Sequence, residues 1–379
     1  MAKIMVSAGE VSGDMHAAAV LKEVKNKIKQ TEIFGMGSTA LLDLGAEILI
    51  DPTAISTIGY LEAFKNIGQH FKNLKQMRQL LKKRQPDLVF LVDYSAFNMR
   101  LAKSCSQLGI PAVNYFPPSA WVYNRRRADK MAAYGTNIAA VFPMERDVYQ
   151  AAGADVTFVG HPLLDLVKVQ ASSSELRAEL KLSKVRKVIA LFPGSRHSEV
   201  ESLLPEMIKA AARLHKDYQT EFVLAAAAGI TDQFLAKFLD KIDFDLPVLR
   251  GSNYKIMKAA DLLLIASGTT SLEAAILNTP HLLGYHSAFT TYLLAKYIFK
   301  VKFVGLPNII MQKEIIPELL QNDFTAAKIY RQVADWLENP VKLQQLKSEL
   351  AVVRKKLGGG GAVKKTAELL IDKGGLRNG

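Results

Sequence analysis

The 379-residue sequence contains a single cysteine, Cys105, which excludes an intramolecular disulfide and fits a reducing compartment. Its neighbours suggest that Cys105 packs within a helix. No apolar run approaches the ~20 residues that a membrane-spanning helix needs. The N-terminal stretch 1–10 is too short in apolar length for a signal peptide, and it runs directly into a glycine turn. We therefore expect a soluble or membrane-surface-bound protein on the cytoplasmic side.

Motifs for several kinds of chemistry are also missing. No GxxxxGK[ST] loop is present, which argues against a P-loop phosphoryl-transfer enzyme. No cluster of His, Cys and Asp has metal-ligand spacing, and we predict neither a metal site nor another cofactor. The acid-x-acid pattern at Asp243 and Asp245 falls in a short predicted loop, and we interpret it as solvent-exposed.

The charge balance points to an anionic partner. Lys and Arg number 49 against 36 Asp and Glu, which gives a formal net charge of +13. A phosphorylated substrate, an anionic membrane surface or a nucleic acid would each fit this balance. Nucleic acid is the least favoured of the three, because the basic residues are scattered over many predicted helices without a recognisable binding motif.

Short apolar strands, glycine turns and helical segments alternate along the chain, which predicts an α/β fold. The pattern begins with a strand over 3–7 and a glycine turn, and it restarts with a strand over 188–192. The polar segment 171–184 between the two series suggests a domain boundary. We therefore predict two Rossmann-like doubly wound domains that face a cleft. The predicted ranges are an N-terminal domain over 1–170, a C-terminal domain over 185–345, and C-terminal helices over 346–379 for which packing back on the N-terminal domain is one arrangement.

The stretch 262–276 carries the clearest site pattern. Its apolar run ends at Ser267, Gly268 and Thr269, and an Ala- and Leu-rich helical pattern follows. Free backbone amides at the start of such a helix bind anions at the carboxyl edge of a parallel sheet. Glu273, which we place in the first helical turn, could favour the helix dipole or accept hydrogen bonds from sugar hydroxyls. This pattern predicts half of a nucleotide-sugar site, with an ordinary strand-to-helix turn as the alternative.

A second loop of the same predicted domain supplies the other half. The strand over 188–192 leads to Gly194, Ser195 and Arg196. An arginine on a tight turn offers a planar fork of donors that suits a diphosphate. Together the two loops could bind a nucleoside diphosphate without a metal ion.

Asp93 ends the clearest strand of the N-terminal half, which spans 86–93. A carboxylate at the carboxyl end of a buried strand lies at the mouth of the sheet, where chemistry is commonly done. Asp93 could deprotonate an acceptor hydroxyl, or it could cap the following helix.

Other residues form a weaker set of candidates for the acceptor or the cleft. The glycines of the first turn permit a close backbone approach, but a purely structural turn is equally consistent with them. His161 either lines the cleft or fills it, and the arginines at 125–127 either hold a phosphate or form a solvated helix face. The weaker candidates are Gly9, Glu10, Ser12, Gly13, Asn98, Ser119, Trp121 and His161.

Two amphipathic stretches suggest surfaces. The region 58–84 has apolar residues at helical spacing with basic residues between them, as expected for a helix packed on the sheet or touching an anionic lipid surface. Exposed apolar side chains near Phe64 and Phe71 would favour the lipid surface. The aromatic and basic stretch 289–303 suits a membrane-surface helix or the face of a homodimer.

Eight motifs in order resemble the lipid-A-disaccharide synthase family, whose members are inverting glycosyltransferases with the two-domain GT-B fold. The resemblance covers nearly the whole chain. The motifs are SAGEVSGD (7–14), the Asp93 strand with Asn98, PPSAW (117–121), FVGHP (158–162), LFPGSR (191–196), ASGTTSLE (266–273), LPN (306–308) and PELLQ (317–321).

The resemblance implies transfer of 2,3-diacylglucosamine from its UDP derivative to 2,3-diacylglucosamine 1-phosphate. The products would be the β-1,6-linked disaccharide 1-phosphate and UDP, formed by a protein peripherally associated with the inner face of the inner membrane. By the same resemblance, Asp93 is the catalytic base, and Arg196, Glu273 and Asn308 belong to the UDP site.

The chain departs from the family pattern at two places. Tyr123 stands where a second tryptophan is usual, and Met311, Gln312 and Lys313 replace a usual Ala-Gly-Arg. Lys313 keeps the positive charge of the arginine but loses its planar fork of donors.

Two other functions share parts of this pattern. A UDP-N-acetylglucosamine 2-epimerase, or another GT-B enzyme, would share the fold and the UDP site, but the epimerase would need no lipid-facing apolar surface. A non-catalytic nucleotide-sugar-binding protein would retain Arg196 and Glu273 and would have no use for Asp93.

Overall fold

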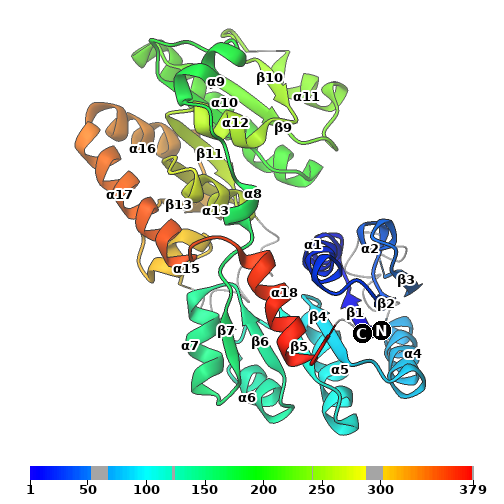
Figure 1. The fold of residues 1–379 in the computed structure, drawn as a ribbon. Coiled ribbons are helices and arrows are strands. Elements are labelled where there is room, and N and C mark those ends of the chain that lie inside the picture. Colours follow the sequence, from blue (N-terminus) through cyan, green and yellow to red (C-terminus); the bar gives the residue numbers. More distant parts are fainter. Residues whose placement is uncertain (53–66, 122–123, 241, 287–301, 378–379) are drawn as a thin grey trace. The chain divides into compact units, whose positions relative to one another are not determined.

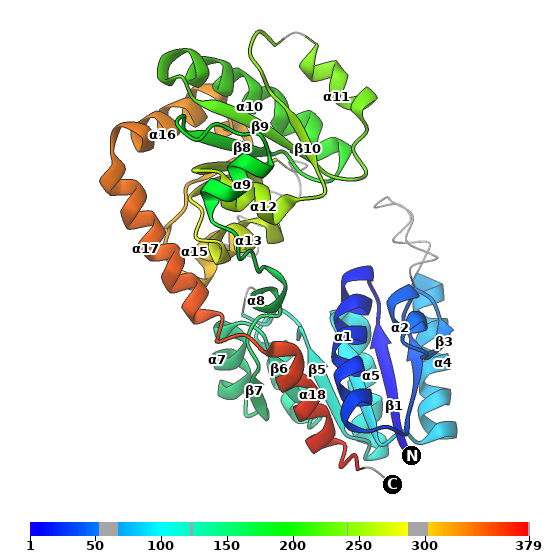
Figure 2. The same cartoon turned by 45° about the horizontal axis from the view of Figure 1, so that its top comes forward.

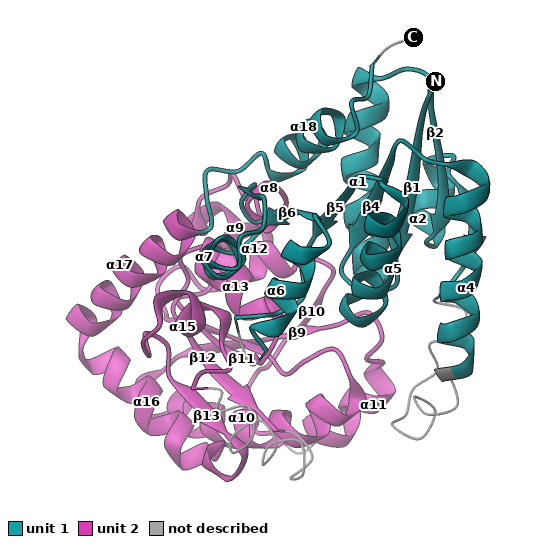
Figure 3. Ribbon diagram, turned by 90° about the horizontal axis from the view of Figure 1, so that it is seen from below, with its two compact units in different colours: residues 1–162, 357–379 teal, residues 163–356 magenta. Residues whose placement is uncertain are grey.

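The computed structural model describes residues 1–52, 67–121, 124–240, 242–286 and 302–377. The chain divides into two compact units, which Figure 3 colours separately. Unit 1 comprises Met1–Pro162 and Leu357–Gly379, and unit 2 comprises Leu163–Lys356. The polar segment 171–184 thus lies inside unit 2. Ser172 in this segment begins a helix through a reciprocal capping box with Glu175.

Unit 1 is built on a parallel sheet. In its described residues the strand order is β3-β2-β1-β4-β5-β6-β7. The order reverses between β1 and β4, which pair directly with Ala8 beside Val92. The carboxyl ends of these two strands therefore form the topological switch point, where open α/β sheets bind ligands. The strands are β1 (Ala2–Ala8), β2 (Thr31–Met36), β3 (Glu47–Ile50), β4 (Leu88–Val92), β5 (Ala112–Tyr115), β6 (Asn137–Ala140) and β7 (Val156–Phe158).

Helices cover both faces of this sheet, as its fully buried central strand β4 requires. Helices α1 and α18 lie side by side in Figures 1 and 2, and they contact each other and β4. Side chains of α4 and α5 pack on alternate residues of the strands, in a core that includes Cys105, whose thiol pKa burial raises to about 12. The helices are α1 (Val11–Lys27), α2 (Thr39–Asp43), α4 (Ile67–Arg84), α5 (Ser95–Leu108), α6 (Arg126–Ala133), α7 (Pro143–Ala151) and α18 (Ala362–Lys373).

Unit 2 repeats the plan. Its described strands are parallel in the order β10-β9-β8-β11-β12-β13, with the switch point between β8 and β11. The strands are β8 (Val188–Phe192), β9 (Glu221–Ala226), β10 (Val248–Arg250), β11 (Leu262–Ala266), β12 (His281–Tyr285) and β13 (Glu318–Leu320). The helices are α8 (Leu163–Leu166), α9 (Ser173–Glu179), α10 (His197–Tyr218), α11 (Asp232–Leu239), α12 (Asn253–Ala259), α13 (Thr269–Ile276), α15 (Leu306–Met311), α16 (Ala326–Glu338) and α17 (Pro340–Lys356), with a 3-10 turn at Gln321–Asp323. The predicted fold class, two doubly wound Rossmann-like arrays, is confirmed.

The chain crosses between the units twice, and a backbone hydrogen bond within unit 1 ties the two crossings together. The N–H of His161 donates to the carbonyl oxygen of Leu357 at 3.0 Å. Gly160, at φ 86°, lies so close that a Cβ there would be 3.0 Å from that same oxygen. The FVGHP motif therefore has a structural reason for its glycine, because a Cβ would crowd that oxygen and the positive φ would strain any other residue.

Some predicted surface features fall partly outside the described residues. Of the amphipathic region 58–84, the structure describes the portion in α4, where the Phe71 side chain is 58% exposed. Phe64, Tyr123 and nearly all of 289–303 lie outside the described residues. No helix in the described part of the chain combines the length and the apolar character that a membrane crossing requires.

A buried histidine fixes helix α13 on its sheet in unit 2. His281 is fully buried, and its Nδ1 lies 3.0 Å from the carbonyl oxygen of Thr279. Because a carbonyl can only accept, Nδ1 carries the proton and Nε2 accepts from the Ser271 hydroxyl at 3.0 Å. Burial lowers the pKa of His281 from 6.5 to about 4, so the imidazole is neutral near pH 7.

This pairing predicts a pH-dependent contribution to stability. A histidine whose pKa is depressed by folding stabilises the native state fully above the unfolded pKa of 6.5, and this contribution is lost as the pH falls towards 4. We expect the free energy of unfolding of the parent to exceed that of His281→Gln, which does not titrate, at about pH 7.5. The difference should shrink by up to about 1.4 kcal/mol per pH unit below the unfolded pKa. Urea titrations at several pH values measure it, and a difference independent of pH would contradict the account.

Candidate functional site

The switch point of unit 2 gathers two loops that are far apart in sequence. Strands β8 and β11 pair side by side, and their carboxyl ends lead into the loops that begin at Pro193 and Ser267. The residues predicted there line one cavity of about 270 Å³, as expected for loops that leave neighbouring parallel strands at the same edge. The six are Gly194, Ser195, Arg196, Ser267, Gly268 and Thr269.

Glu199 occupies part of this cavity and was not among the predicted site residues. Its Oε2 accepts hydrogen bonds from the backbone N–H groups of Ser195 at 3.0 Å and Arg196 at 3.3 Å. Its Oε1 accepts from the Arg196 guanidinium at 2.8 Å. The carboxylate thus caps helix α10, and its spacing three residues after Arg196 is the sequence signal that could have identified it. The Arg196 side chain is nevertheless 79% exposed, which leaves its other donors open to a ligand.

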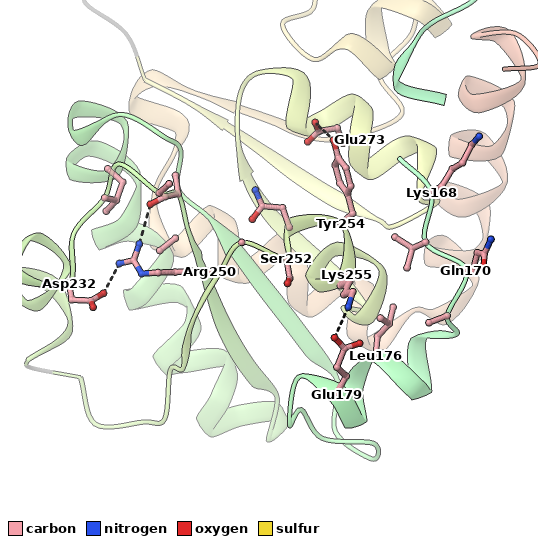
Figure 4. A pocket seen from close by; sticks show the side chains of 18 of the residues that line it. Lys168, Gln170, Leu176, Glu179, Asp232, Arg250, Ser252, Tyr254, Lys255 and Glu273 are labelled. Carbon is pink, nitrogen blue, oxygen red and sulfur yellow. Dashed lines mark hydrogen bonds and ion pairs between the residues drawn. The ribbon is translucent and has the colours of Figure 1, made fainter. Parts of the chain in front are cut away.

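A larger cavity of about 1310 Å³ adjoins the first, since Ala227 and Asn253 line both. Figure 4 shows it, with Tyr254 and Glu273 facing each other on its wall. The Tyr254 hydroxyl donates to Oε1 of Glu273 at 3.3 Å. The sequence did not predict Tyr254 as a site residue, because it lies on α12, nineteen positions before Glu273 and outside any short motif.

The sequence predicted that Glu273 lies in the first helical turn, and this prediction is wrong. Gly268 is the N-cap of α13, so Glu273 is the fifth residue of the helix and faces the larger cavity from the second turn. Burial raises the pKa of Glu273, and the hydrogen bond from Tyr254 partly opposes this shift. A carboxylate in this position can accept hydrogen bonds from ligand hydroxyls, but it is too far along the helix for a strong dipole interaction.

Asn308 does not offer its side chain to a ligand, in contrast to its predicted place in the UDP site. The residue is fully buried, and its Oδ1 accepts from the backbone N–H groups of Ile315 and Ile316 at 2.7 and 3.0 Å. Its Nδ2 donates to the carbonyl oxygen of Ile316 at 2.9 Å and to Glu318 at 2.7 Å. The hydrogen-bonding groups of its side chain are thus engaged within unit 2, where they hold the turn before β13.

The switch point of unit 1 gathers the first glycine turn and Asp93. A Cβ on Gly13 would lie 3.7 Å from the Cβ of Asp93, so the start of α1 approaches the aspartate closely. Gly9 leaves room for the ring of Tyr94, since a Cβ there would lie 2.1 Å from that ring. Burial raises the pKa of Glu10, and the charge of Asp93 raises it further. The structure therefore brings Gly9, Glu10 and Gly13 together with Asp93.

Asp93 has a carboxyl group whose pKa is shifted by its surroundings. Burial raises the pKa of its carboxyl group, and a hydrogen bond with the Tyr94 backbone opposes part of that shift. A base is most effective when its pKa lies near the working pH, and a partly buried aspartate approaches that condition from below. The Tyr94 hydroxyl, in turn, lies 2.5 Å from Nδ1 of His70 on α4. His70 gave no signal in the sequence, because this contact joins helix α4 to the turn before α5, twenty-four positions away.

The remaining candidates take different positions. His161 is 5% exposed and packs edge-on against Phe116, and the Phe116 ring also stacks on His16 at 4.9 Å. Burial lowers the pKa of His161 to about 3, so it fills this cluster as a neutral side chain. Ser12 is exposed at the start of α1, Ser119 is half-buried, and Asn98 is fully buried behind Asp93. The indole N–H of Trp121 is buried without a hydrogen-bond partner in the described part of the chain.

Solved structures share the fold at low sequence identity. The UDP-GlcNAc 2-epimerase from Neisseria meningitidis, bound to UDP-GlcNAc, superposes with a TM-score of 0.62 at 14% identity, covering 98% of this chain and 100% of that one. Acinetobacter baumannii MurG superposes with a TM-score of 0.63 at 16% identity, covering 98% and 99% of the two chains. Both are GT-B proteins, so the GT-B fold is confirmed.

Sequence comparison gives a narrower result. The chain is 33% identical over 371 residues to a lipid-A-disaccharide synthase of Geobacter metallireducens, covering 98% of this chain and 97% of the relative. It is 34% identical to lipid-A-disaccharide synthase 1 of Legionella pneumophila, covering 94% and 93% of the two chains. The family described as lipid-A-disaccharide synthetase matches residues 4–369. The chain therefore belongs to the lipid-A-disaccharide synthetase family.

Proposed function

We propose that the two switch points divide the reaction of the family between the two units. Unit 2 binds the UDP part of the donor, and Asp93 of unit 1 removes the proton from the acceptor hydroxyl. As a member of its family, the chain is a glycosyltransferase of lipid A biosynthesis. It transfers 2,3-diacylglucosamine from the UDP-linked donor to 2,3-diacylglucosamine 1-phosphate, giving the β-1,6-linked disaccharide 1-phosphate and UDP.

The observation that carries the donor site is the convergence of two distant loops on one cavity. The diphosphate would lie in the smaller cavity, among the backbone amides and hydroxyls that begin α13 and beside Arg196. The nucleoside would extend into the adjoining larger cavity, where Glu273 can accept hydrogen bonds from the ribose hydroxyls. Fixed positive groups at the diphosphate stabilise the charge that grows on it as the glycosidic bond breaks.

Asp93 fits the acceptor half of an inverting reaction. The acceptor hydroxyl attacks the anomeric carbon as the bond to the diphosphate breaks, and its proton must pass to a base at the same time. Burial raises the pKa of the Asp93 carboxyl group. Burial also raises the pKa of the neighbouring Glu10, and the charge of Asp93 raises it further. The charge of Asp93 thus favours the protonated form of Glu10.

The acylated substrates reside in a membrane, and one helix of unit 1 suits an anionic surface. Helix α4 has no acidic residue, and Phe71 on it is exposed beneath the guanidinium of Arg100. These features support peripheral association with the inner face of the inner membrane. A homodimer, suggested by the stretch 289–303, stays a prediction. The basic side chains of α4 are Lys72, Lys75, Arg78, Lys82, Lys83 and Arg84.

The donor site predicts that Arg196→Ala weakens UDP binding. Removing a guanidinium that contacts the diphosphate should cost about 1.5–3 kcal/mol of binding free energy, which is roughly a tenfold to hundredfold rise in Kd by calorimetry. The matched control is Arg213→Ala on the same helix α10, where Arg213 stacks on Tyr330 at 3.8 Å. Equal UDP affinity for the Arg196 variant and the parent would remove Arg196 from the site.

The base assignment predicts that Asp93→Asn leaves UDP binding nearly intact while turnover falls about 10²- to 10⁴-fold, since the amide cannot accept the proton. Asp87→Asn is the control, because Asp87 precedes the same strand at its opposite end and binds the backbone N–H of Lys3. Turnover is measured with the donor and acceptor in mixed micelles. Parent-level turnover in the Asp93 variant would rule out its role as the base.

The surface assignment predicts binding to vesicles that contain anionic lipid, with weaker binding at high salt because the charges of α4 are screened. Phe71→Ser should reduce the bound fraction in sedimentation, because it removes an exposed apolar side chain from this surface. Leu108→Ser serves as the control, since Leu108 is also exposed but ends α5. The proposal fails if both variants sediment with vesicles as much as the parent does, or if the bound fraction is the same with and without anionic lipid.

A further inference from the structure

Asn98 ties together the carboxyl ends of the two central strands of unit 1. It is fully buried, and its Oδ1 accepts a hydrogen bond from the Ser7 hydroxyl at 2.6 Å. Its Nδ2 lies 2.7 Å from the carbonyl oxygen of Asp93, 3.2 Å from that of Val92 and 3.3 Å from that of Ser7. An amide nitrogen has only two hydrogens, so the three carbonyls share them, and the shortest contact is with Asp93.

The backbone that Asn98 holds is in an unfavourable conformation. Asp93 and Tyr94 follow each other at φ 51° and 46°, in the left-handed region that L-residues rarely occupy. Each such residue costs about 1–2 kcal/mol, so the pair persists only where its surroundings hold it in place. Strain of this kind gathers at functional sites because it aims a side chain in a direction that regular structure does not allow.

Three further contacts restrain the same turn. The N–H of Asp93 donates to the carbonyl oxygen of Tyr115 at 3.0 Å, so both sides of the aspartate's backbone are hydrogen-bonded. The ring of Tyr94 lies in the space left by Gly9, and its hydroxyl bonds to His70. Asn98 differs from these three restraints because it bonds to the carbonyl oxygen of the Asp93–Tyr94 peptide. Its own side chain is held in turn by the Ser7 hydroxyl.

We propose that Asn98, held in its rotamer by Ser7, is a positioning residue that fixes the direction of the Asp93 carboxylate. It acts through the Asp93–Tyr94 peptide and does not touch the substrate, which refines its predicted place in the acceptor site. The inference rests on the proposed role of Asp93 as the base. A carboxylate displaced by about 1 Å from its productive position costs on the order of a hundredfold in rate, so loss of this anchor affects turnover strongly.

Asn114 provides a matched comparison for a merely structural role. It is also fully buried, and its Nδ2 donates to a carbonyl oxygen of the same strand β4, that of Leu91, at 3.0 Å. Within the described part of the chain, its side chain makes no hydrogen bond to the Asp93–Tyr94 turn. If Asn98 only supported the fold, replacing it with alanine would change the kinetics no more than replacing Asn114 does.

The test compares Asn98→Ala, Ser7→Ala and Asn114→Ala in the full-length enzyme. For Asn98→Ala we expect kcat to fall about a hundredfold with KM nearly unchanged, and for Ser7→Ala a smaller fall of about threefold to tenfold. The acidic limb of the kcat/KM profile of Asn98→Ala should also move to lower pH, because water entering the turn reduces the burial that raises the Asp93 pKa. Asn114→Ala should keep the parent kcat and pH profile, and all three should bind UDP as the parent does.

The outcomes separate the two proposals. If Asp93→Asn abolishes turnover and Asn98→Ala matches Asn114→Ala in kcat and in pH profile, the positioning role is overturned while the base assignment stands. If Asp93→Asn keeps parent turnover, the base assignment fails first and the positioning role fails with it. If Asn98→Ala does not fold, Ser7→Ala decides, and its parent kcat and pH profile would contradict the inference.

Discussion

The left-handed turn at Asp93 and Tyr94 is the constraint on which the site of unit 1 depends. The turn links strand β4 to helix α5 and carries the Asp93 side chain at the carboxyl end of the strand. Hydrogen bonds from Asn98 and to the carbonyl oxygen of Tyr115 hold the turn, and Gly9 makes room for the ring of Tyr94. The glycine turn after β1 therefore provides the space into which the Tyr94 ring fits, and its predicted contact with the acceptor stays a prediction.

Unit 2 uses the same sheet edge for a different purpose. Its switch point carries backbone amides, hydroxyls and the exposed Arg196, together with the carboxylate of Glu199. Glu199 holds two of those amides and the guanidinium, so an incoming diphosphate would have to compete with an internal carboxylate for Arg196. In the proposed function, one fold supplies an anion-binding edge in one unit and a proton-accepting edge in the other, because the loops differ between the units.

The sequence predicted the strands and their ends well, and the side-chain partners poorly. Runs such as 262–266 must be buried strands, and residues after them must lie at the sheet edge, so Asp93 and Arg196 could be placed without coordinates. Glu273 was set one turn too early, because the helix start at Gly268 depends on a backbone angle. The sequence did not show that the Asn308 side chain is bonded within unit 2, because its partners lie seven to ten positions away and no local pattern reveals such contacts.

The most direct test of the central claim is the reaction itself. Purified protein is incubated with UDP-2,3-diacylglucosamine and 2,3-diacylglucosamine 1-phosphate, and the products are identified by mass spectrometry. The account predicts the β-1,6-linked disaccharide 1-phosphate and UDP in equal amounts, with no product when the acceptor is omitted. The account would be contradicted if the product were an epimerised UDP-sugar. It would also be contradicted if the unaltered protein bound UDP but formed no disaccharide.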